Sequence, residues 1–150
     1  MTDTLSIGWT RSDADRKISA FKRAFGFITA VQLIVAFIYL LWPTLALNTV
    51  GLDPATGNEW SSVWAATLIL VTLYQIPGLL DPVRNRFTVV MAVFARVWMS
   101  VTFLILGGSY YYFAAFDIIF GTIIAITYYR LVIAEPVSYT HLTLPTNGCV

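Results

Sequence analysis

Residues 87–106 read FTVVMAVFARVWMSVTFLIL, a run in which Arg96 is the only charged residue. A helix needs about 20 apolar residues to cross the hydrocarbon core of a bilayer, and this run has that length. Similar runs occur at 24–42, 60–80 and 112–129. One such run could be a helix buried in a soluble core, but four in succession predict transmembrane helices.

The composition indicates that lipid, and not water, surrounds these runs. Hydrophobic residues make up 58% of the 150-residue chain and charged residues only 11%, with a mean hydropathy of +0.75. A soluble domain of this length has no room to bury four such helices. We therefore predict an all-α integral membrane protein, an antiparallel four-helix bundle whose single domain covers residues 1–136.

The positions of lysine and arginine predict the orientation of the chain. The connections at 43–59 and 107–111 contain no basic residue. Because basic residues are retained on the cytoplasmic side, both chain ends are expected there. The net charge is only +1, and the basic residues form no continuous patch in the sequence. We therefore expect no nucleic-acid partner. All basic residues except Arg96 flank the runs on one side: Arg11, Arg16, Lys17, Lys22, Arg23, Arg84, Arg86 and Arg130.

The connections between the runs carry further information. The DPVRNR link at 81–86 is short, so the second and third helices are expected to be antiparallel neighbours. The longer outer connection contains mildly apolar residues at 44–52, which are expected to lie along the interface and cap the helices from outside. Aromatic residues suited to an interfacial belt gather at this end: Trp42, Trp60, Trp64, Tyr110, Tyr111 and Tyr112.

The C-terminal stretch differs in character from the rest of the chain. Residues 137–146 read VSYTHLTLPT, which resembles the translation of a transposon-end adapter used in sequencing libraries. We therefore expect residues 137–150 to be a non-native tail. The only histidine, His141, and the only cysteine, Cys149, lie in it. For the remaining chain we expect no metal site, no cofactor and no thiol or histidine catalysis.

Two ionisable residues, Arg96 and Asp117, lie deep within the runs. At a rise of about 1.5 Å per residue, Arg96 falls near the bilayer midplane and Asp117 lies inside the outer end of its helix. A charge at this depth costs at least about 2.5 kcal/mol and normally faces a partner. A hairpin through Gly107 and Gly108 leaves roughly one turn between the two depths. An arginine side chain covers that offset, so we predict an Arg96–Asp117 ion pair.

Neighbouring side chains extend this prediction to a polar cluster. Gln32 in the first run, with Thr72 or Gln75 in the second, falls near the same depth and is expected to complete the hydrogen bonds of the guanidinium. Each charge also lies on a stripe of small residues, which lets helices pack closely. The stripes contain Ala92 and Ser100 beside Arg96, and Gly121 and Ala125 beside Asp117.

Three roles remain open for this cluster. The pair can fix the register of the helices without any ligand, since buried pairs can favour specificity over stability. Alternatively, Arg96 binds an anionic or carbonyl-bearing apolar ligand such as a quinone, a lipid head group or an aromatic acid. The third role is a proton or ion path, although one acidic residue offers no relay. A wet cavity around Arg96 would favour binding or transport, and a dry, tightly paired cluster would favour the structural role.

The chain resembles the DoxX-like and BphX-like group of small bacterial membrane proteins. The resemblance covers most of residues 18–130 and rests on four short-looped helices, the DPVRNR link, Arg96 in the third run and the segment FDIIFG at 116–121. It implies a multi-pass protein of the bacterial cytoplasmic (inner) membrane. Members of the group include accessory subunits of oxidoreductases. Outside the expected tail this chain lacks the cysteines that thiol-active relatives would need, and no catalytic residue can be transferred to it.

These observations predict a non-enzymatic membrane protein. We expect an accessory or structural subunit that contacts the lipid bilayer and either another membrane subunit or a second copy of itself. The alternative is a binding or transport protein for a small apolar or anionic ligand at the Arg96–Asp117 cluster. An enzyme ranks third, because the chain before the tail offers no second catalytic group beyond tyrosine and arginine.

Overall fold

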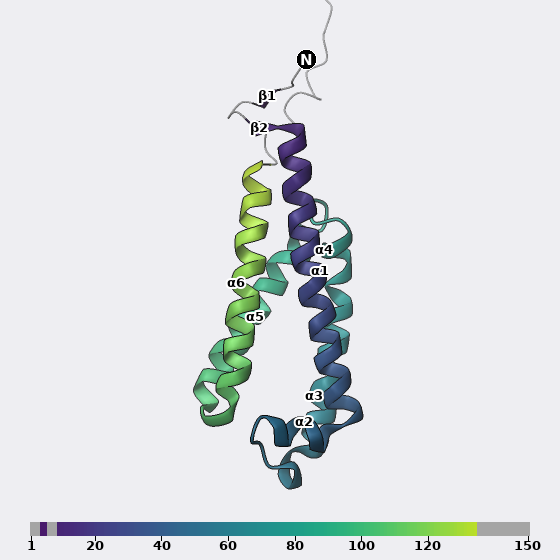
Figure 1. Cartoon of the computed structure of the whole chain (residues 1–150), viewed down its shortest axis with the longest axis vertical. Coiled ribbons are helices and arrows are strands. Elements are labelled where there is room, and N and C mark those ends of the chain that lie inside the picture. Colours follow the sequence, from purple (N-terminus) through teal and green to yellow (C-terminus); the bar gives the residue numbers. More distant parts are fainter. Residues whose placement is uncertain (1–3, 6–8, 135–150) are drawn as a thin grey trace, which may run out of the picture.

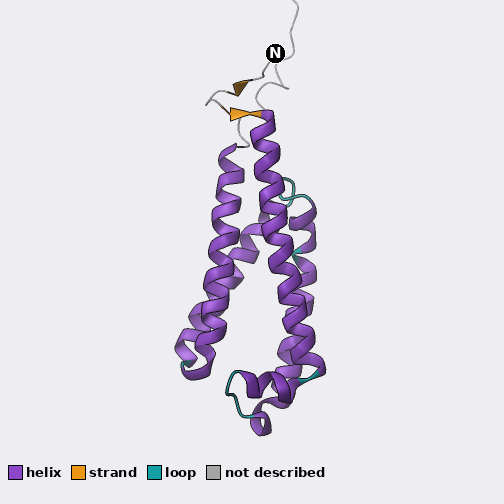
Figure 2. Cartoon of the chain, viewed as in Figure 1, coloured by secondary structure: helices purple, strands orange, loops and turns teal. Residues whose placement is uncertain are grey.

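A computed structural model describes residues 4–5 and 9–134 of the chain. This part is helical apart from two short antiparallel strands ahead of the first helix, β1 (Thr4–Leu5) and β2 (Trp9–Thr10). The expected non-native tail, 137–150, lies outside the described residues. Figure 2 shows the helical character of the whole described part.

Four helical segments are long and apolar enough to cross a membrane, which confirms the predicted number and approximate placement of such segments. They are Ser12–Leu41, Glu59–Leu80, Arg86–Leu106 and Gly108–Ala134. The individual elements, labelled in Figure 1, are α1 (Arg11–Leu41), α2 (Pro43–Thr49), α3 (Pro54–Tyr74), α4 (Ile76–Leu80), α5 (Arg86–Leu106), the 3-10 turn η1 (Gly108–Tyr110) and α6 (Tyr111–Ala134).

Helices α1 and α6 extend beyond the predicted runs at the end where the chain begins. Phe21 and Phe25 lie one turn apart on α1, and both are fully buried. The Phe21 ring packs against the Tyr128 ring of α6, with 5.6 Å between the ring centroids. This apolar contact stabilises α1 and α6 as helices past the ends of the predicted runs, because packing of one apolar face supplies most of a helix's stability.

The long helices pack in the order α3, α1, α6, α5. Helix α1 contacts both α3 and α6, and α5 packs along α6, whereas α3 and α5 contact each other only sparsely. The expected neighbours, the second and third membrane runs, therefore meet mainly where α4 contacts α5. The short link constrains only the helix ends, so the prediction is wrong for the rest of their length. In Figure 1 the start of α1 and the end of α6 lie together at one end, away from α2.

The second apolar run is broken near its end, just before Pro77 and Gly78. Helix α3 stops at Tyr74, and α4 restarts with Pro77 in its first turn, where a missing N–H is tolerated. The Asn85 side chain donates hydrogen bonds to the carbonyl oxygens of Pro77 and Asp81, each at 3.1 Å. The link at 81–85 is thus fastened to α4 by its own polar groups.

The outer connection folds into α2 and a turn that contacts η1, the connection between α5 and α6. Ala46 and Leu47 of α2 are buried. Gly51 adopts a φ of 73°, a left-handed conformation that favours glycine. Its carbonyl oxygen accepts a hydrogen bond of 3.3 Å from the Ser109 hydroxyl in η1. The predicted cap over the outer ends of the helices is therefore a short helix in contact with α1 and α3.

Candidate functional site

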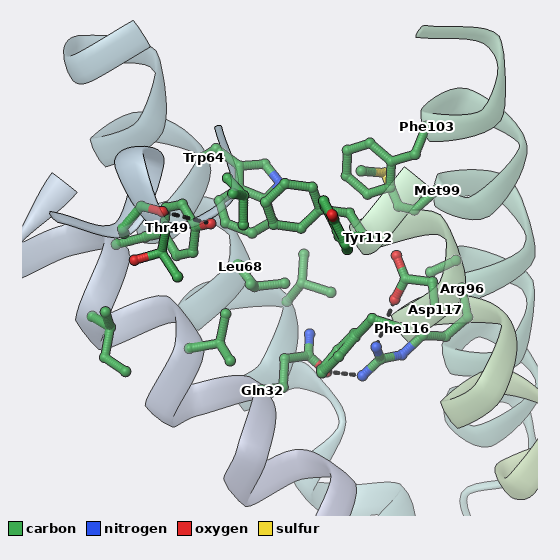
Figure 3. Close-up of a pocket in the computed structure, with 18 of the residues that line it drawn as sticks. Gln32, Thr49, Trp64, Leu68, Arg96, Met99, Phe103, Tyr112, Phe116 and Asp117 are labelled. Carbon is green, nitrogen blue, oxygen red and sulfur yellow. Dashed lines mark hydrogen bonds and ion pairs between the residues drawn. The ribbon is translucent and has the colours of Figure 1, made fainter. Parts of the chain in front are cut away.

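Arg96 is the centre of a buried polar cluster. The residue is 5% exposed, and its Nη1 donates to Asp117 Oδ1 at 2.6 Å. Its Nη2 donates to Gln32 Oε1, and the guanidinium carbon lies 5.5 Å from the centroid of the Phe116 ring. Figure 3 shows the guanidinium between these partners, which come from α1 and α6. The structure thus brings Arg96, Asp117 and Gln32 together.

The close approach of α5 and α6 places the two charges within reach of each other. A Cβ atom added at Gly121 would lie 3.0 Å from the Cβ of Arg96. Only glycine therefore allows this spacing without a shift of either helix. The Ser100 hydroxyl donates to the Arg96 carbonyl oxygen at 2.7 Å and so stays within its own helix.

The stripes of small residues have unequal roles. Ala92, Ser100 and Gly121 are buried, whereas Ala125 is half-buried. Ala125 lies at the edge of the α5–α6 contact and lines shallow grooves on the outside of the helices.

Two residues expected in the cluster do not bond to Arg96 in the described structure. Thr72 is fully buried, and its hydroxyl donates to the Leu68 carbonyl oxygen one turn earlier, at 2.6 Å. Gln75 is 4% exposed, and its Oε1 has no hydrogen-bond partner among the described residues. The expectation fails because α3, which ends just before Gln75, packs on α1 and only sparsely on α5.

Gln75 and Arg96 instead line the same cavity. Its volume is about 480 Å³, and its walls come from α1, α2, α3, α5 and α6 together with Val50 and Gln75. Trp64 and Leu68 on one side lie across from Met99 and Phe103 on the other in Figure 3. We call this space the inner cavity. Most of its surface is apolar, and its ionised groups are Arg96 and Asp117.

A cluster of aromatic rings lies between the inner cavity and a second one of about 370 Å³, the outer cavity, which is lined by residues 52–53, the first part of α3 and Tyr110 of η1. The Tyr39, Trp64 and Phe113 rings meet edge to face, with centroids 5.3–5.9 Å apart. These three rings and Phe103 line both cavities. The outer cavity contains Ser61, whose Oγ is buried and has no hydrogen-bond partner in the described part.

The sequence alone did not predict this cluster of Tyr39, Trp64 and Phe113, the aromatic wall between the two cavities. Trp64 was expected at the membrane interface, but it is half-buried against Tyr39 and Phe113. Trp42 and Trp60 are 58% and 76% exposed, as expected for residues of a belt. The only signal for Trp64 was its distance from the end of the run, since it lies one turn further inside than Trp60.

The chemistry available in the inner cavity is hydrogen bonding within an apolar enclosure. The Arg96–Asp117 pair carries no net charge, and Gln75 adds an amide. Among the described residues, no three His, Cys, Asp or Glu side chains are grouped in a way that could hold a metal ion. His141 and Cys149 lie outside that part of the chain. The cavity suits the orientation of a small, mostly apolar molecule by a few polar contacts.

Comparison with protein-family models, with curated proteins and with solved structures gives no match for this chain.

Proposed function

We propose that the chain is a multi-pass protein of the bacterial inner membrane, an antiparallel four-helix bundle with both ends cytoplasmic. The four apolar helical segments support this topology. The basic residues other than Arg96 also support it. They lie toward the end of the molecule where α1 starts, where the 81–86 link runs and where α6 ends. The resemblance to the DoxX-like and BphX-like group is consistent with it.

We further propose that the protein binds a small, mostly apolar molecule in the inner cavity. One observation carries this proposal: the buried polar side chains of Arg96 and Gln75 line the same mostly apolar cavity. A few polar groups within apolar walls are typical of small-molecule sites. The cavity volume of about 480 Å³ lies within the range of small-molecule sites.

A purely structural role accounts for less of the geometry. An ion pair that only fixed the helix register would be expected in a closed interior, without a cavity beside it. Here the cavity also reaches the outside of the molecule, because Leu45 and Tyr112 in its lining are 64% and 70% exposed. An apolar molecule could therefore enter from the surrounding lipid. We propose a non-enzymatic binding protein that acts as an accessory subunit and holds this molecule for a partner.

Native mass spectrometry of the full chain, released gently from the bacterial membrane that expresses it, tests this proposal. We expect a reproducible bound small molecule that is lost in Ala95→Phe. Ala95 lines the inner cavity, and the added ring would fill it. The matched control is Ala66→Phe, which places the same ring on an exposed position of α3. A bare wild-type chain in lipid-rich preparations, or equal ligand retention in both variants, would contradict binding in the inner cavity.

Cysteine labelling in intact cells tests the topology separately. In a Cys149→Ser background, Leu45→Cys should react with a membrane-impermeant maleimide added outside, and Arg84→Cys should react only after the cells are opened. Both positions are exposed in the structure. The reverse labelling pattern would mean that the bundle is inserted the other way round.

A further inference from the structure

We propose that a groove between α1 and α6, at the end of the molecule where the chain begins, binds the phosphate of an anionic lipid in the cytoplasmic leaflet. The site lies apart from the inner cavity and does not depend on the molecule proposed to bind there. It rests only on the proposed position of this end of the bundle at the cytoplasmic face of the membrane. The groove has a volume of about 360 Å³ and is lined by Asp13, Arg16, Lys17, Ala20, Thr127 and Arg130. We call it the basic groove.

The first step concerns charge. Arg16 and Lys17 of α1 and Arg130 of α6 line the same hollow, so the cations come from both helices. Asp13 is the one carboxylate among the described lining residues, and it accepts a hydrogen bond from Arg16. Three positive charges and one negative charge leave the basic groove with a net charge of +2. Like charges gathered in one hollow repel one another, and an anion between them relieves that repulsion.

The second step concerns how the cations are held. The lining residues Ala20 and Thr127 are followed in the sequence by Phe21 and Tyr128, whose rings pack across the two helices with centroids 5.6 Å apart. The closed core continues with Leu131, which is 2% exposed and follows Arg130 directly. The start of α1 and the end of α6 lie side by side in Figure 1. The cations therefore project from two helices that are packed together, and not from a separate charged tail.

The third step concerns depth in the membrane. Helix α6 begins at Tyr111, which is 55% exposed and belongs to the aromatic belt expected at the outer interface. Arg130 lies 19 residues further along the helix. At a rise of about 1.5 Å per residue, this separation is roughly 28 Å, close to the thickness of a hydrocarbon core of about 30 Å. Arg130 therefore lies at the level of the inner lipid phosphates, where basic pockets between transmembrane helices bind anionic head groups.

The fourth step concerns the surface next to the basic groove, toward the membrane interior. Phe27 lies seven residues after Ala20 on α1, and Ile123 lies four residues before Thr127 on α6, so both continue the lined faces of their helices. Phe27 is 64% exposed and Ile123 is 38% exposed. An acyl chain attached to the bound phosphate can lie on this apolar surface, whereas a free phosphate would gain nothing from it. The arrangement thus favours a lipid as the source of the anion.

Native mass spectrometry of the full chain in detergent micelles, titrated with one lipid at a time, tests this inference. We expect phosphatidylglycerol to bind at least about tenfold more tightly than phosphatidylcholine with the same acyl chains, because its head group carries a net negative charge. In the double variant Lys17→Gln with Arg130→Gln, this preference should fall below about threefold. The matched control is Lys22→Gln with Arg23→Gln. It removes the same charge at the same end of the molecule, but from residues that do not line the basic groove, and should keep the preference.

Each outcome has a distinct meaning. Equal affinity of the wild type for the two lipids would overturn the inference, and this comparison needs no variant. An equal loss of preference in both double variants would overturn it in favour of a general attraction by the basic end of the molecule.

A third arm separates the two sources of phosphate. Excess inorganic phosphate should leave phosphatidylglycerol bound, because it has no acyl chain to place on the apolar surface. Full displacement would overturn the lipid in favour of a soluble phosphate compound. Detergent micelles have no inner and outer face, so a failure here is distinguishable from a failure of the topology, which the cysteine labelling tests.

Discussion

The two halves of the helix assembly are packed differently. Toward the end where the chain begins, a closed core contains residues that are almost fully buried: Phe21, Phe25, Ile28, Val89, Ala92, Ile124 and Leu131. Toward α2, the buried cluster is smaller and consists of Tyr39, Ala46, Leu47 and Ala65. Both cavities have Tyr39 of this second cluster in their walls. Arg96 lies where the closed half meets the open one.

This difference separates the part that holds the helices from the part that can accept a molecule. Lipid tails are as apolar as leucine, so close packing and polar contacts, rather than burial from water, must hold membrane helices together. A Cβ at Gly78 would lie 3.0 Å from Val89 Cγ2, which shows how tightly the closed half is packed. The open half lacks such close contacts. An empty apolar cavity lowers the free energy of unfolding unless a molecule fills it.

The largest effect is expected for Asp117→Ala. The substitution removes the counterion of a buried guanidinium, and breaking such a pair costs about 3–5 kcal/mol in the free energy of unfolding. Unfolding in mixed micelles, followed by circular dichroism, measures this loss. Arg96→Ala should lower stability in the same direction, because it leaves the Asp117 carboxylate without its partner.

The double variant Arg96→Met with Asp117→Leu is the control for this prediction. It removes both charges and should recover most of the stability lost in either single variant, because apolar residues can replace a buried pair. A double variant as unstable as Asp117→Ala alone would show that the pair is not coupled as the 2.6 Å contact implies.

The next effect compares one ring in each half. Phe25→Ala removes a fully buried ring from the closed core and should cost about 3 kcal/mol of unfolding free energy. Phe113→Ala, at a half-buried ring that already borders two cavities, should cost at least about 1 kcal/mol less, because fewer contacts are lost. The same unfolding assay compares them. Equal losses would mean that the two halves are packed alike.

A third test acts on the contact between α5 and α6. Gly121→Leu places a side chain where even a Cβ would lie 3.0 Å from Arg96 Cβ, and overpacking of this kind costs about 1–3 kcal/mol. Ala115→Leu adds similar bulk at an exposed position of α6 and should be close to neutral. The difference in unfolding free energy between the two variants isolates the helix contact. A stable Gly121→Leu protein would indicate a looser α5–α6 contact than the one described.

The smallest effect is expected at the outer turn. Ser109→Ala removes the 3.3 Å hydrogen bond to the Gly51 carbonyl oxygen and should cost about 0.5–1.5 kcal/mol or less. The readout is hydrogen exchange: amides in residues 43–53 should exchange faster, while those of the closed core keep their protection. Unchanged exchange in the outer connection would show that α2 is held by its apolar contacts alone.

The sequence predicted the features that depend on position along one helix. The four apolar segments follow from run length, and their bounds agree closely with the prediction except where α1 and α6 extend. The contact between Arg96 and Asp117 follows from the depth of each residue on consecutive helices and from the high cost of an unpaired charge. The contact of Gln32 with Arg96 was predicted in the same way, because the two residues lie at a similar depth.

The remaining features depend on which helices are neighbours, and depth along one helix does not determine this. Thr72 and Gln75 have the expected depth, but α3, which contains Thr72 and ends just before Gln75, packs on α1 and only sparsely on α5. Trp64 has the composition of a belt residue, and only its partners on α1 and α6 make it part of an interior wall. The cavity itself is a consequence of the sparse α3–α5 contact, and no residue pattern along the chain indicated it.

The neutral character of the Arg96–Asp117 pair also bears on the membrane potential. An elementary charge that crosses a membrane gains or loses about 2.3 kcal/mol for roughly each 100 mV. The pair has no net charge, and its guanidinium and carboxylate lie 2.6 Å apart, so any movement of the pair as a unit transfers almost no charge through the field. Any movement of the two helices that carry the pair should therefore be insensitive to the membrane potential.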